Sequence, residues 1–288
     1  INNDKFGFKN PNTIYEKKIE IVLLGDSYTE GQCYKETNDI AAYLRKSNYN
    51  SANLGVTGSG PLVSLGVLKE YAKKFQPDFV IYLYYEGNDI SDLSWEKNVP
   101  LLKNYLNKNF TQNLLGKENE IKKFLSDVSK ESHEYINYKI NFQRSSDPKK
   151  RLVIIEQLKD FLELTNLRNY IKNNFYLIQD KDFDADLFYS IINIMNEETN
   201  SWGGKFIFVY TPSWARYFTK FSKEQRYFIK KKSILNNLEK NNILTIDLTN
   251  FLDQEENLKQ YFPLGYVGHF NKEGYKKISS ILINKINN

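Results

Sequence analysis

The stretch at positions 19–32, IEIVLLGDSYTEGQ, carries the clearest structural signal in the chain. A largely apolar run ends abruptly at Gly25, Asp26 and Ser27, which is typical of a buried strand followed by a turn. Ser27 therefore lies where a strand ends and a helix should begin. In an open α/β sheet, ligands bind at this edge. Ser27 is then either a reactive residue or, like Thr29, a cap of the next helix.

The rest of the chain repeats the alternation of strand and helix. Short runs rich in β-branched and aromatic residues predict further strands, and apolar residues spaced three and four apart predict helices. Such repeated units favour parallel strands covered by helices on both faces. We therefore predict an α/β fold, a three-layer α/β/α sandwich with a central parallel sheet of about five strands. The predicted strands are 19–25, 51–55, 78–87, 204–212 and 243–249, and the predicted helices are 36–47, 64–75, 222–241 and 271–286.

The long interval at about 91–201 departs from this alternation. It contains helical patterns but no convincing central strand. A segment of this size that leaves the end of a strand is the kind of element that forms lids and binding surfaces. We expect a single domain over residues 1–288, with a largely helical insertion at about 91–201.

Composition narrows the classes of partner. The 288 residues include 40 Lys and Arg against 35 Asp and Glu, and these charges are spread along the chain, so we expect no nucleic-acid partner. The single cysteine, Cys33, cannot form an internal disulfide, and with two histidines in all we expect no metal site. No window approaches the roughly 18 consecutive apolar residues that cross a bilayer, so we expect no integral membrane segment.

Three later stretches place small or polar residues after predicted strands or before a predicted helix. In NLGVTGSGP, Gly58 lies in a glycine cluster that lets the backbone turn tightly and aim an N–H group at a ligand. In YYEGNDISDL, Asn88 follows a strand and offers a side-chain amide, and in LGYVGHFNKEGY, His269 precedes the last helix. Each residue alone has an ordinary structural interpretation. Together with Ser27, in this order, they form a constellation.

This constellation resembles the SGNH hydrolases, also called the GDSL esterase/lipase family, which are named after Ser, Gly, Asn and His in four blocks of sequence. The matching blocks are GDSYTEG (25–31), NLGVTGSG (53–60), EGNDI (86–90) and GYVGHFNKEGY (265–275). The resemblance implies an SGNH-type, flavodoxin-like fold. The interval 91–201 lies outside it.

The resemblance also implies a role for each matched residue. Ser27 would be the nucleophile, and His269 the general base that takes its proton. The backbone N–H groups of Ser27 and Gly58 and the side-chain amide of Asn88 would form the oxyanion hole. A serine hydroxyl needs a neighbouring base to become a good nucleophile, and attack on an ester creates an oxyanion that fixed donors stabilise.

The acidic residues of the family pattern are only partly matched. Asp26 and Asp89 lie in the first and third blocks and are predicted as supporting residues. The family usually places an aspartate three residues before the histidine, but Tyr266 stands there. Three interpretations follow: a Ser–His dyad with a backbone carbonyl or a water orienting the ring, an acid from elsewhere such as Glu273, or weakened or lost activity. We favour the dyad, because the third member of a triad orients and stabilises the imidazole rather than transferring the proton itself.

The resemblance implies hydrolysis of a carboxylic ester through an acyl-enzyme, without a metal or organic cofactor. The segment DKFGFKN (4–10) looks like the lead-in of exported, polysaccharide-associated relatives. We therefore expect a periplasmic or extracellular esterase whose substrate is an O-acetyl or short acyl group on a carbohydrate. The alternatives are an O-acyltransferase to a sugar hydroxyl and, because the aspartate is missing, a catalytically disabled binding module.

Overall fold

The computed structural model forms two compact units, Ile1–Gln112 with Asp180–Asn288, and Asn113–Gln179. The sheet and the candidate site belong to the first unit. In the second unit, the described residues include the short helix η4 (Leu114–Lys117). A single domain with an insertion at 91–201 stays a prediction. The residues that the structure describes are 3–31, 37–124, 126–128, 130, 134, 183–218, 226–265 and 268–287.

The sheet of the first unit has five parallel strands in the order β2-β1-β3-β4-β5. This confirms the predicted fold class and the position of each predicted strand. The strand order reverses between β1 and β3, so the crevice outside their C-terminal ends is the expected ligand site. The strands are β1 (Ile21–Gly25), β2 (Ser51–Asn53), β3 (Phe79–Tyr85), β4 (Lys205–Thr211) and β5 (Leu244–Asp247).

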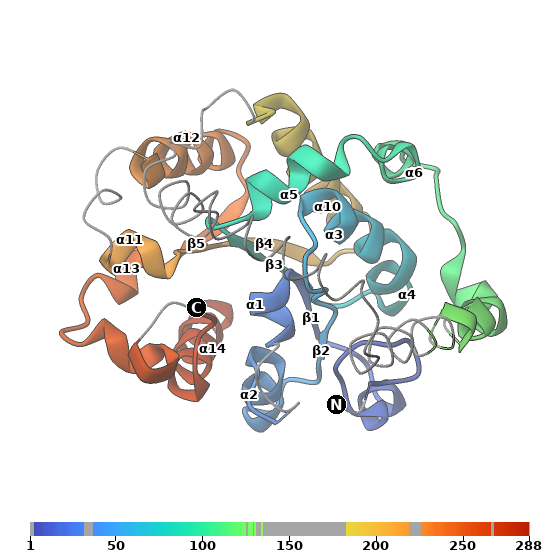
Figure 1. Ribbon diagram of the computed structural model, residues 1–288, viewed down its shortest axis with the longest axis horizontal. Helices are drawn as coiled ribbons and strands as arrows, with labels where there is room; N and C mark the ends of the chain where they lie inside the picture. Colours follow the sequence, from blue (N-terminus) through green and yellow to red (C-terminus); the bar gives the residue numbers. More distant parts are fainter. Residues whose placement is uncertain are drawn as a thin grey trace, which may run out of the picture. The chain divides into compact units, whose positions relative to one another are not determined.

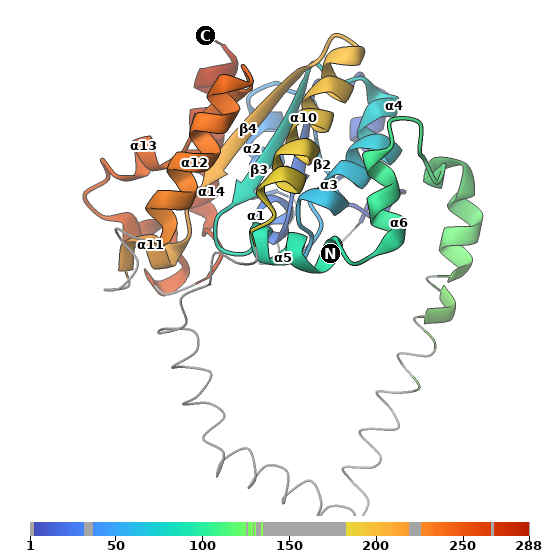
Figure 2. The same ribbon diagram turned by 90° about the horizontal axis from the view of Figure 1, so that it is seen from above.

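Helices cover both faces of the sheet (Figure 1). Side chains of α3 (Pro61–Val67), α10 (Ala185–Ser201) and α12 (Arg226–Lys240) share one core cluster with the sheet, and those of α2 (Ile40–Lys46) and α14 (Lys272–Ile286) share the other. Figure 2 shows the short helices α1 (Ser27–Glu30) and α5 (Asp89–Glu96) at the end of the sheet where β3 finishes. Within the described part of the chain, no helix has both the length and the apolar character that a bilayer span requires.

The described α-helices of this unit are α1 (Ser27–Glu30), α2 (Ile40–Lys46), α3 (Pro61–Val67), α4 (Lys73–Phe75), α5 (Asp89–Glu96), α6 (Pro100–Lys103), α10 (Ala185–Ser201), α11 (Trp214–Phe218), α12 (Arg226–Lys240), α13 (Thr249–Leu252) and α14 (Lys272–Ile286). A π-helical turn, η2 (Leu68–Ala72), joins α3 to α4. The described 3-10 helices are η1 (Asn12–Glu16), η3 (Asn104–Leu106), η6 (Leu258–Tyr261) and η7 (Pro263–Gly265).

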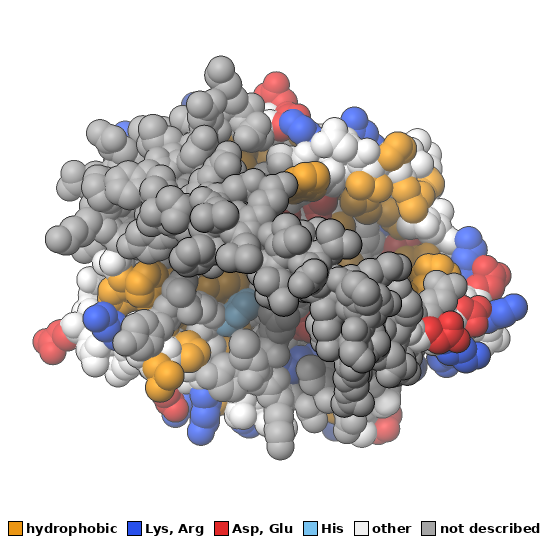
Figure 3. Space-filling model, in the orientation of Figure 1, with side chains coloured by type: hydrophobic (Ala, Val, Ile, Leu, Met, Phe, Trp, Pro, Cys, Tyr) orange, Lys and Arg blue, Asp and Glu red, His pale blue; other side chains and the backbone are white. Residues whose placement is uncertain are grey.

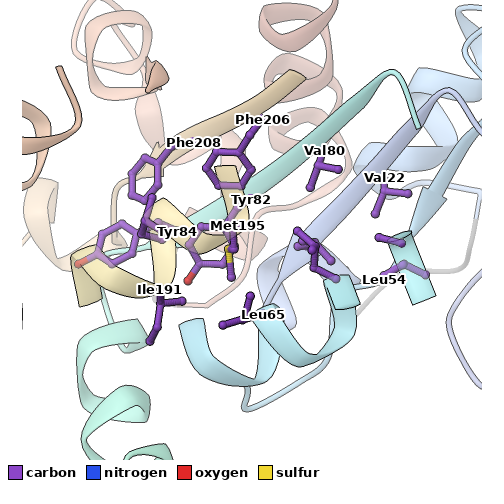
Figure 4. Packing of buried hydrophobic residues seen from close by; sticks show 14 of the residues in the cluster. Val22, Leu54, Leu65, Val80, Tyr82, Tyr84, Ile191, Met195, Phe206 and Phe208 are labelled. Atoms are coloured by element: carbon purple, nitrogen blue, oxygen red, sulfur yellow. The ribbon is translucent and has the colours of Figure 1, made fainter. Parts of the chain in front are cut away.

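Alternate residues of β3 pack on opposite faces of the sheet, as the geometry of a strand requires. Tyr82 and Tyr84 belong to the cluster that contains Met195 of α10, whereas Ile81 and Leu83 belong to the cluster with α2 and α14. Figure 4 shows the first of these clusters. Burial of each large apolar side chain contributes about 1.5–3 kcal/mol. The two clusters therefore hold the strand ends, and the residues that follow them, in fixed positions.

Candidate active site

The turn between β1 and α1 presents Ser27 at the C-terminal edge of the sheet. β1 ends at Gly25, where φ is +143° and an added Cβ would lie 2.3 Å from Oγ1 of Thr29, so a larger residue does not fit. Asp26 caps α1 by accepting a hydrogen bond from the amide of Tyr28 at 2.8 Å. Ser27 is thus the first helical residue and not the cap, and it is 9% exposed.

Ser27 and His269 meet at this edge. Nε2 of His269 lies 2.7 Å from Oγ of Ser27, which is the distance expected between a nucleophile and its base. Burial lowers the pKa of His269 below its usual 6.5, and the charge of Glu30 opposes this effect. Lowering this pKa favours the neutral imidazole, which is the form that can accept a proton. Figure 3 shows histidine surface, in pale blue, beside hydrophobic side chains on this face.

Tyr28, the residue after Ser27, connects α1 to the loop that carries His269. Its hydroxyl donates to the carbonyl of Gly268 at 2.8 Å, and its ring centroid lies 4.6 Å from that of His269. The hydroxyl of Tyr85, at the end of β3, lies 2.8 Å from that of Tyr28, and the two rings stack with centroids 3.8 Å apart. Tyr266 lies outside the described residues, so the Ser–His dyad stays a prediction.

The glycine loop after β2 folds against β1 and α1. The hydroxyl of Ser59 donates to the carbonyl of Gly25 at 3.2 Å, and the amide of Thr57 donates to the carboxylate of Glu30 at 3.0 Å. Gly58 lies between these two contacts with φ +73°, a conformation that favours glycine. The fold thus brings the second block of the constellation against the first.

Glu96 of α5 holds the other end of this loop. Its buried carboxylate accepts hydrogen bonds from the amide of Gly60 at 2.6 Å and from that of Leu62 at 2.9 Å. A Cβ on Gly60 would lie 2.9 Å from Oε2 of Glu96, so the close approach requires glycine. The segment that carries Gly58 is therefore held between two carboxylates, those of Glu30 and Glu96.

Asn88 precedes α5 and is its N-cap residue by position, although its side chain makes no capping bond. Its side-chain oxygen is buried and has no hydrogen-bond partner among the residues described here. Burial raises the pKa of Asp26, and the interaction with the Asn88 side chain partly lowers it again, because that interaction favours the charged carboxylate. This interaction places Asn88 beside the residue that precedes Ser27. Its part in an oxyanion hole stays a prediction.

Asp26 and Asp89, the predicted supporting residues, are both buried at this edge. Oδ2 of Asp89 accepts hydrogen bonds from the hydroxyl of Tyr82 at 2.6 Å and from the amide of Tyr85 at 3.2 Å. Burial raises the pKa of Asp26 to about 6. Burial and the nearby charge of Asp26 raise the pKa of Asp89 well above its usual range. Because the charge of Asp26 raises the pKa of Asp89, the two carboxyl groups resist ionising together.

Sequence reasoning missed the residues that hold α1, the helix that begins at Ser27, from its C-terminal side. Lys9 is 3% exposed, and its ammonium group donates to the carbonyls of Glu30, at 3.2 Å, and of Gly31. The side-chain amide of Asn53 donates to the carbonyl of Thr29 at 2.8 Å. The sequence offers only the segment 4–10 as a signal, which looks like a lead-in. A lysine within it does not indicate which distant carbonyl groups it binds.

A buried ion pair, also missed, joins the ends of β3 and β4. Nε and Nη2 of Arg216 donate to the carboxylate of Glu86 at 2.8 and 2.6 Å, and the amide of Ser213 donates to it at 2.8 Å. The two charged side chains are 10% and 2% exposed. Glu86 belongs to the block EGNDI, so the pair fixes the strand end that leads to Asn88.

The described residues show no group of three or more His, Cys, Asp or Glu side chains arranged to hold a metal ion. Cys33 and the second histidine, His133, lie outside the part of the chain that the structure describes. The absence of a metal and of a cofactor therefore stays a prediction.

The chain was also compared with known proteins. No protein-family model and no curated protein matches it. A GDSL-like lipase from Bacteroides thetaiotaomicron is 13% identical, with a TM-score of 0.48 and coverage of 94% of this chain and 89% of that one. A member of the lipolytic protein G-D-S-L family from Veillonella parvula is 11% identical, with a TM-score of 0.46 and coverage of 92% of this chain and 96% of that one. A mutant acetyl-xylooligosaccharide esterase from Geobacillus Stearmophilus is 12% identical, with a TM-score of 0.49 and coverage of 94% of this chain and 96% of that one. Across most of the chain, the structural neighbours are GDSL (SGNH) lipolytic hydrolases and esterases.

Proposed function

We propose that this chain is a serine esterase that hydrolyses a carboxylic ester through an acyl-enzyme. The observation that carries the proposal is the 2.7 Å distance between Oγ of Ser27 and Nε2 of His269. The position of this pair adds support, because it lies at the C-terminal end of β1, where the strand order reverses and ligands of open α/β sheets bind.

In the first half of the reaction, Oγ of Ser27 attacks the ester carbonyl carbon while Nε2 of His269 takes the serine proton. Negative charge then develops on the carbonyl oxygen. The N–H groups of Ser27 and Gly58 and the side-chain amide of Asn88 would stabilise it. When the tetrahedral intermediate collapses, His269 gives the proton to the departing alcohol, and the acyl group stays on Ser27.

In the second half, a water molecule attacks the acyl-enzyme. His269 takes one proton from this water and returns it to Oγ of Ser27 as the carboxylic acid leaves. The reaction consumes one water and restores the neutral imidazole. A neutral imidazole is needed at the start of both halves, and burial of His269, which lowers its pKa, favours that form.

The test is hydrolysis of p-nitrophenyl acetate by the wild type and by Ser27→Ala, His269→Gln and the control Ser279→Ala. Removing a nucleophile or its base typically costs 10³-fold or more in kcat, so we expect at least about that loss from the first two variants. Ser279 is a buried serine whose hydroxyl donates to the carbonyl of Tyr275 at 2.7 Å within α14, outside the candidate site, so its variant should keep most of the activity. A folded but inactive wild type would favour a disabled binding module instead.

Within the carboxylic esters, we propose an acetyl or short acyl group on a carbohydrate as the substrate. Support for this finer proposal comes from the segment 4–10, which looks like the lead-in of polysaccharide-associated relatives. An acetylated oligosaccharide should then be a better substrate than a long-chain p-nitrophenyl ester. Analysis of the products with and without a sugar acceptor distinguishes the esterase from an acyltransferase, which would form the acylated acceptor.

A further inference from the structure

Tyr85, Tyr28 and the carbonyl of Gly268 form a chain of two hydrogen bonds. The hydroxyl of Tyr28 lies 2.8 Å from the carbonyl of Gly268 and 2.8 Å from the hydroxyl of Tyr85. A phenol has one proton and a carbonyl can only accept, so Tyr28 gives its proton to Gly268 and accepts one from Tyr85. Burial raises the pKa of both phenols above their usual value, so both keep their protons at neutral pH.

Tyr28 contacts the chain on both sides of the imidazole. Its hydroxyl bonds Gly268, the residue before His269, and its ring lies against the imidazole with an interplanar angle of 43°. Phe270, the residue after His269, is buried and meets the ring of Tyr28 edge-on, with centroids 5.5 Å apart. One side chain thus restrains three consecutive residues of the histidine loop.

The contact between Tyr28 and the backbone of Gly268 is a hydrogen bond. Within the described part of the chain, nothing lies within 4 Å of a Cβ added to Gly268, whereas the hydroxyl of Tyr28 lies 2.8 Å from its carbonyl oxygen. An apolar side chain in place of Tyr28 could fill the same buried volume, but it would give the Gly268 carbonyl no donor. The hydroxyl therefore adds a constraint that burial alone does not supply.

We propose that Tyr28 is a positioning residue that holds His269 within hydrogen-bond distance of Ser27, an inference that rests on the proposed function. Because Tyr28 follows Ser27 directly, one turn of helix places both the nucleophile and the loop of its base. In the family pattern, an aspartate at the place of Tyr266 orients the ring. Tyr28 fixes the position of the ring from another direction and without a charge.

The test compares variants that each remove one buried hydroxyl. Tyr28→Phe breaks the bond to Gly268, whereas Tyr85→Phe leaves that bond in place. Tyr105→Phe is the matched control, because Tyr105 is buried and its hydroxyl donates to Glu70 at 2.9 Å, outside the candidate site. For each variant, kcat and KM on p-nitrophenyl acetate are measured per site titrated with a fluorophosphonate, and thermal unfolding is followed by circular dichroism.

We expect Tyr28→Phe to lower kcat about ten- to a hundredfold with little change in KM, since displacing a catalytic group by about 1 Å can cost a hundredfold. Tyr85→Phe should fall between Tyr28→Phe and the wild type, and Tyr105→Phe should match the wild type. A kcat for Tyr28→Phe equal to that of Tyr105→Phe, or above that of Tyr85→Phe, would overturn the inference. A wild type that forms no adduct would instead contradict the proposed function itself, and the inference with it.

Discussion

Nε2 of His269 lies 2.7 Å from Oγ of Ser27, although 242 positions of sequence separate the two residues. The same core cluster supports both sides of this pair. Tyr28, beside Ser27, and Phe270, beside His269, are buried in the cluster that packs α2 and α14 against the sheet. The pair is therefore a product of tertiary packing.

The activity should have an acid limb with an apparent pKa below 6.5. Burial lowers the pKa of His269, and the neutral imidazole is the active form, so kcat/KM should rise through this limb and level off towards neutral pH. Glu30→Gln removes the charge that raises this pKa, while its amide oxygen can still accept from Thr57. The limb should then move to lower pH. A pH profile of kcat/KM checks both statements, and a limb that moves upward in the variant would contradict the assignment.

Asp26→Asn should stabilise the protein at neutral pH. Burial raises the pKa of Asp26 from 3.8 to about 6, so the folded state holds this proton more tightly than the unfolded chain does. The contribution of Asp26 to the free energy of unfolding is therefore greatest below the unfolded pKa, falls as the pH rises from 3.8 to about 6, and stays low above it. At about 1.36 kcal/mol per pKa unit, ionisation of Asp26 at pH 7 lowers the free energy of unfolding by about 3 kcal/mol.

The side-chain oxygen of the variant can still cap α1, so the removal of the charge is the main change. Urea unfolding at about pH 4 and pH 7 measures the effect. We expect a gain of about 2–3 kcal/mol at the higher pH and a small one at the lower pH. An equal gain at both pH values would show that the ionisation of Asp26 is not the cause.

Lys9→Met should lower both stability and rate. It removes the donor to the carbonyls of Glu30 and Gly31, and leaving buried acceptors unpaired costs about 1–3 kcal/mol. The helix α1 is a single turn and cannot persist without tertiary contacts. We therefore expect Ser27 to lose its fixed position and kcat to fall about tenfold or more.

Lys69→Met is the matched control for this change. Lys69 is also buried, and its ammonium group donates to the carbonyls of Tyr105 and Asn107, each at 2.7 Å, outside the candidate site. Both variants should lose free energy of unfolding, but only Lys9→Met should lose kcat per titrated site. Equal kcat values would mean that Lys9 stabilises the fold and does nothing further for Ser27.

Glu96→Ala should weaken the predicted oxyanion hole. The amides of Gly60 and Leu62 lose their acceptor, so the segment that carries Gly58 gains freedom. Because loss of one oxyanion donor costs about 10²–10³ in kcat, we expect a loss of up to about that size, with the acid limb unmoved. Glu70→Ala is the control, since this buried carboxylate accepts hydrogen bonds away from the site. If both variants keep the wild-type kcat per site, the loop does not depend on Glu96.

The strands and the helices α2, α3, α12 and α14 could be predicted because their signals are local. The runs at 21–25 and 206–210 consist of apolar or aromatic residues and glycine, as is typical of strands buried on both faces, and each is followed within two positions by turn residues. The parallel order of strands also predicted where the polar residues after β1 and β3 would gather. Ser27 and Asn88 lie at that edge for this reason.

The contacts that hold the site could not be predicted, because they join residues far apart in the chain. Tyr28 and Gly268 are separated by 240 positions, and Lys9 and Gly31 by 22. A tyrosine after Ser27 has the same local signature whether it packs in a core or bonds a distant carbonyl. The sequence also leaves open which residue caps α1, because aspartate and serine both cap helices well. The extended backbone conformation of Asp26 makes it the cap.

The most direct test of Ser27 and His269 as nucleophile and base is intact-protein and peptide mass spectrometry after treatment with a fluorophosphonate. We expect one covalent adduct per chain, on Ser27, formed rapidly in the wild type and far more slowly in His269→Gln. A folded wild type that forms no adduct, or an adduct on another serine, would contradict the claim that Ser27 and His269 act as nucleophile and base.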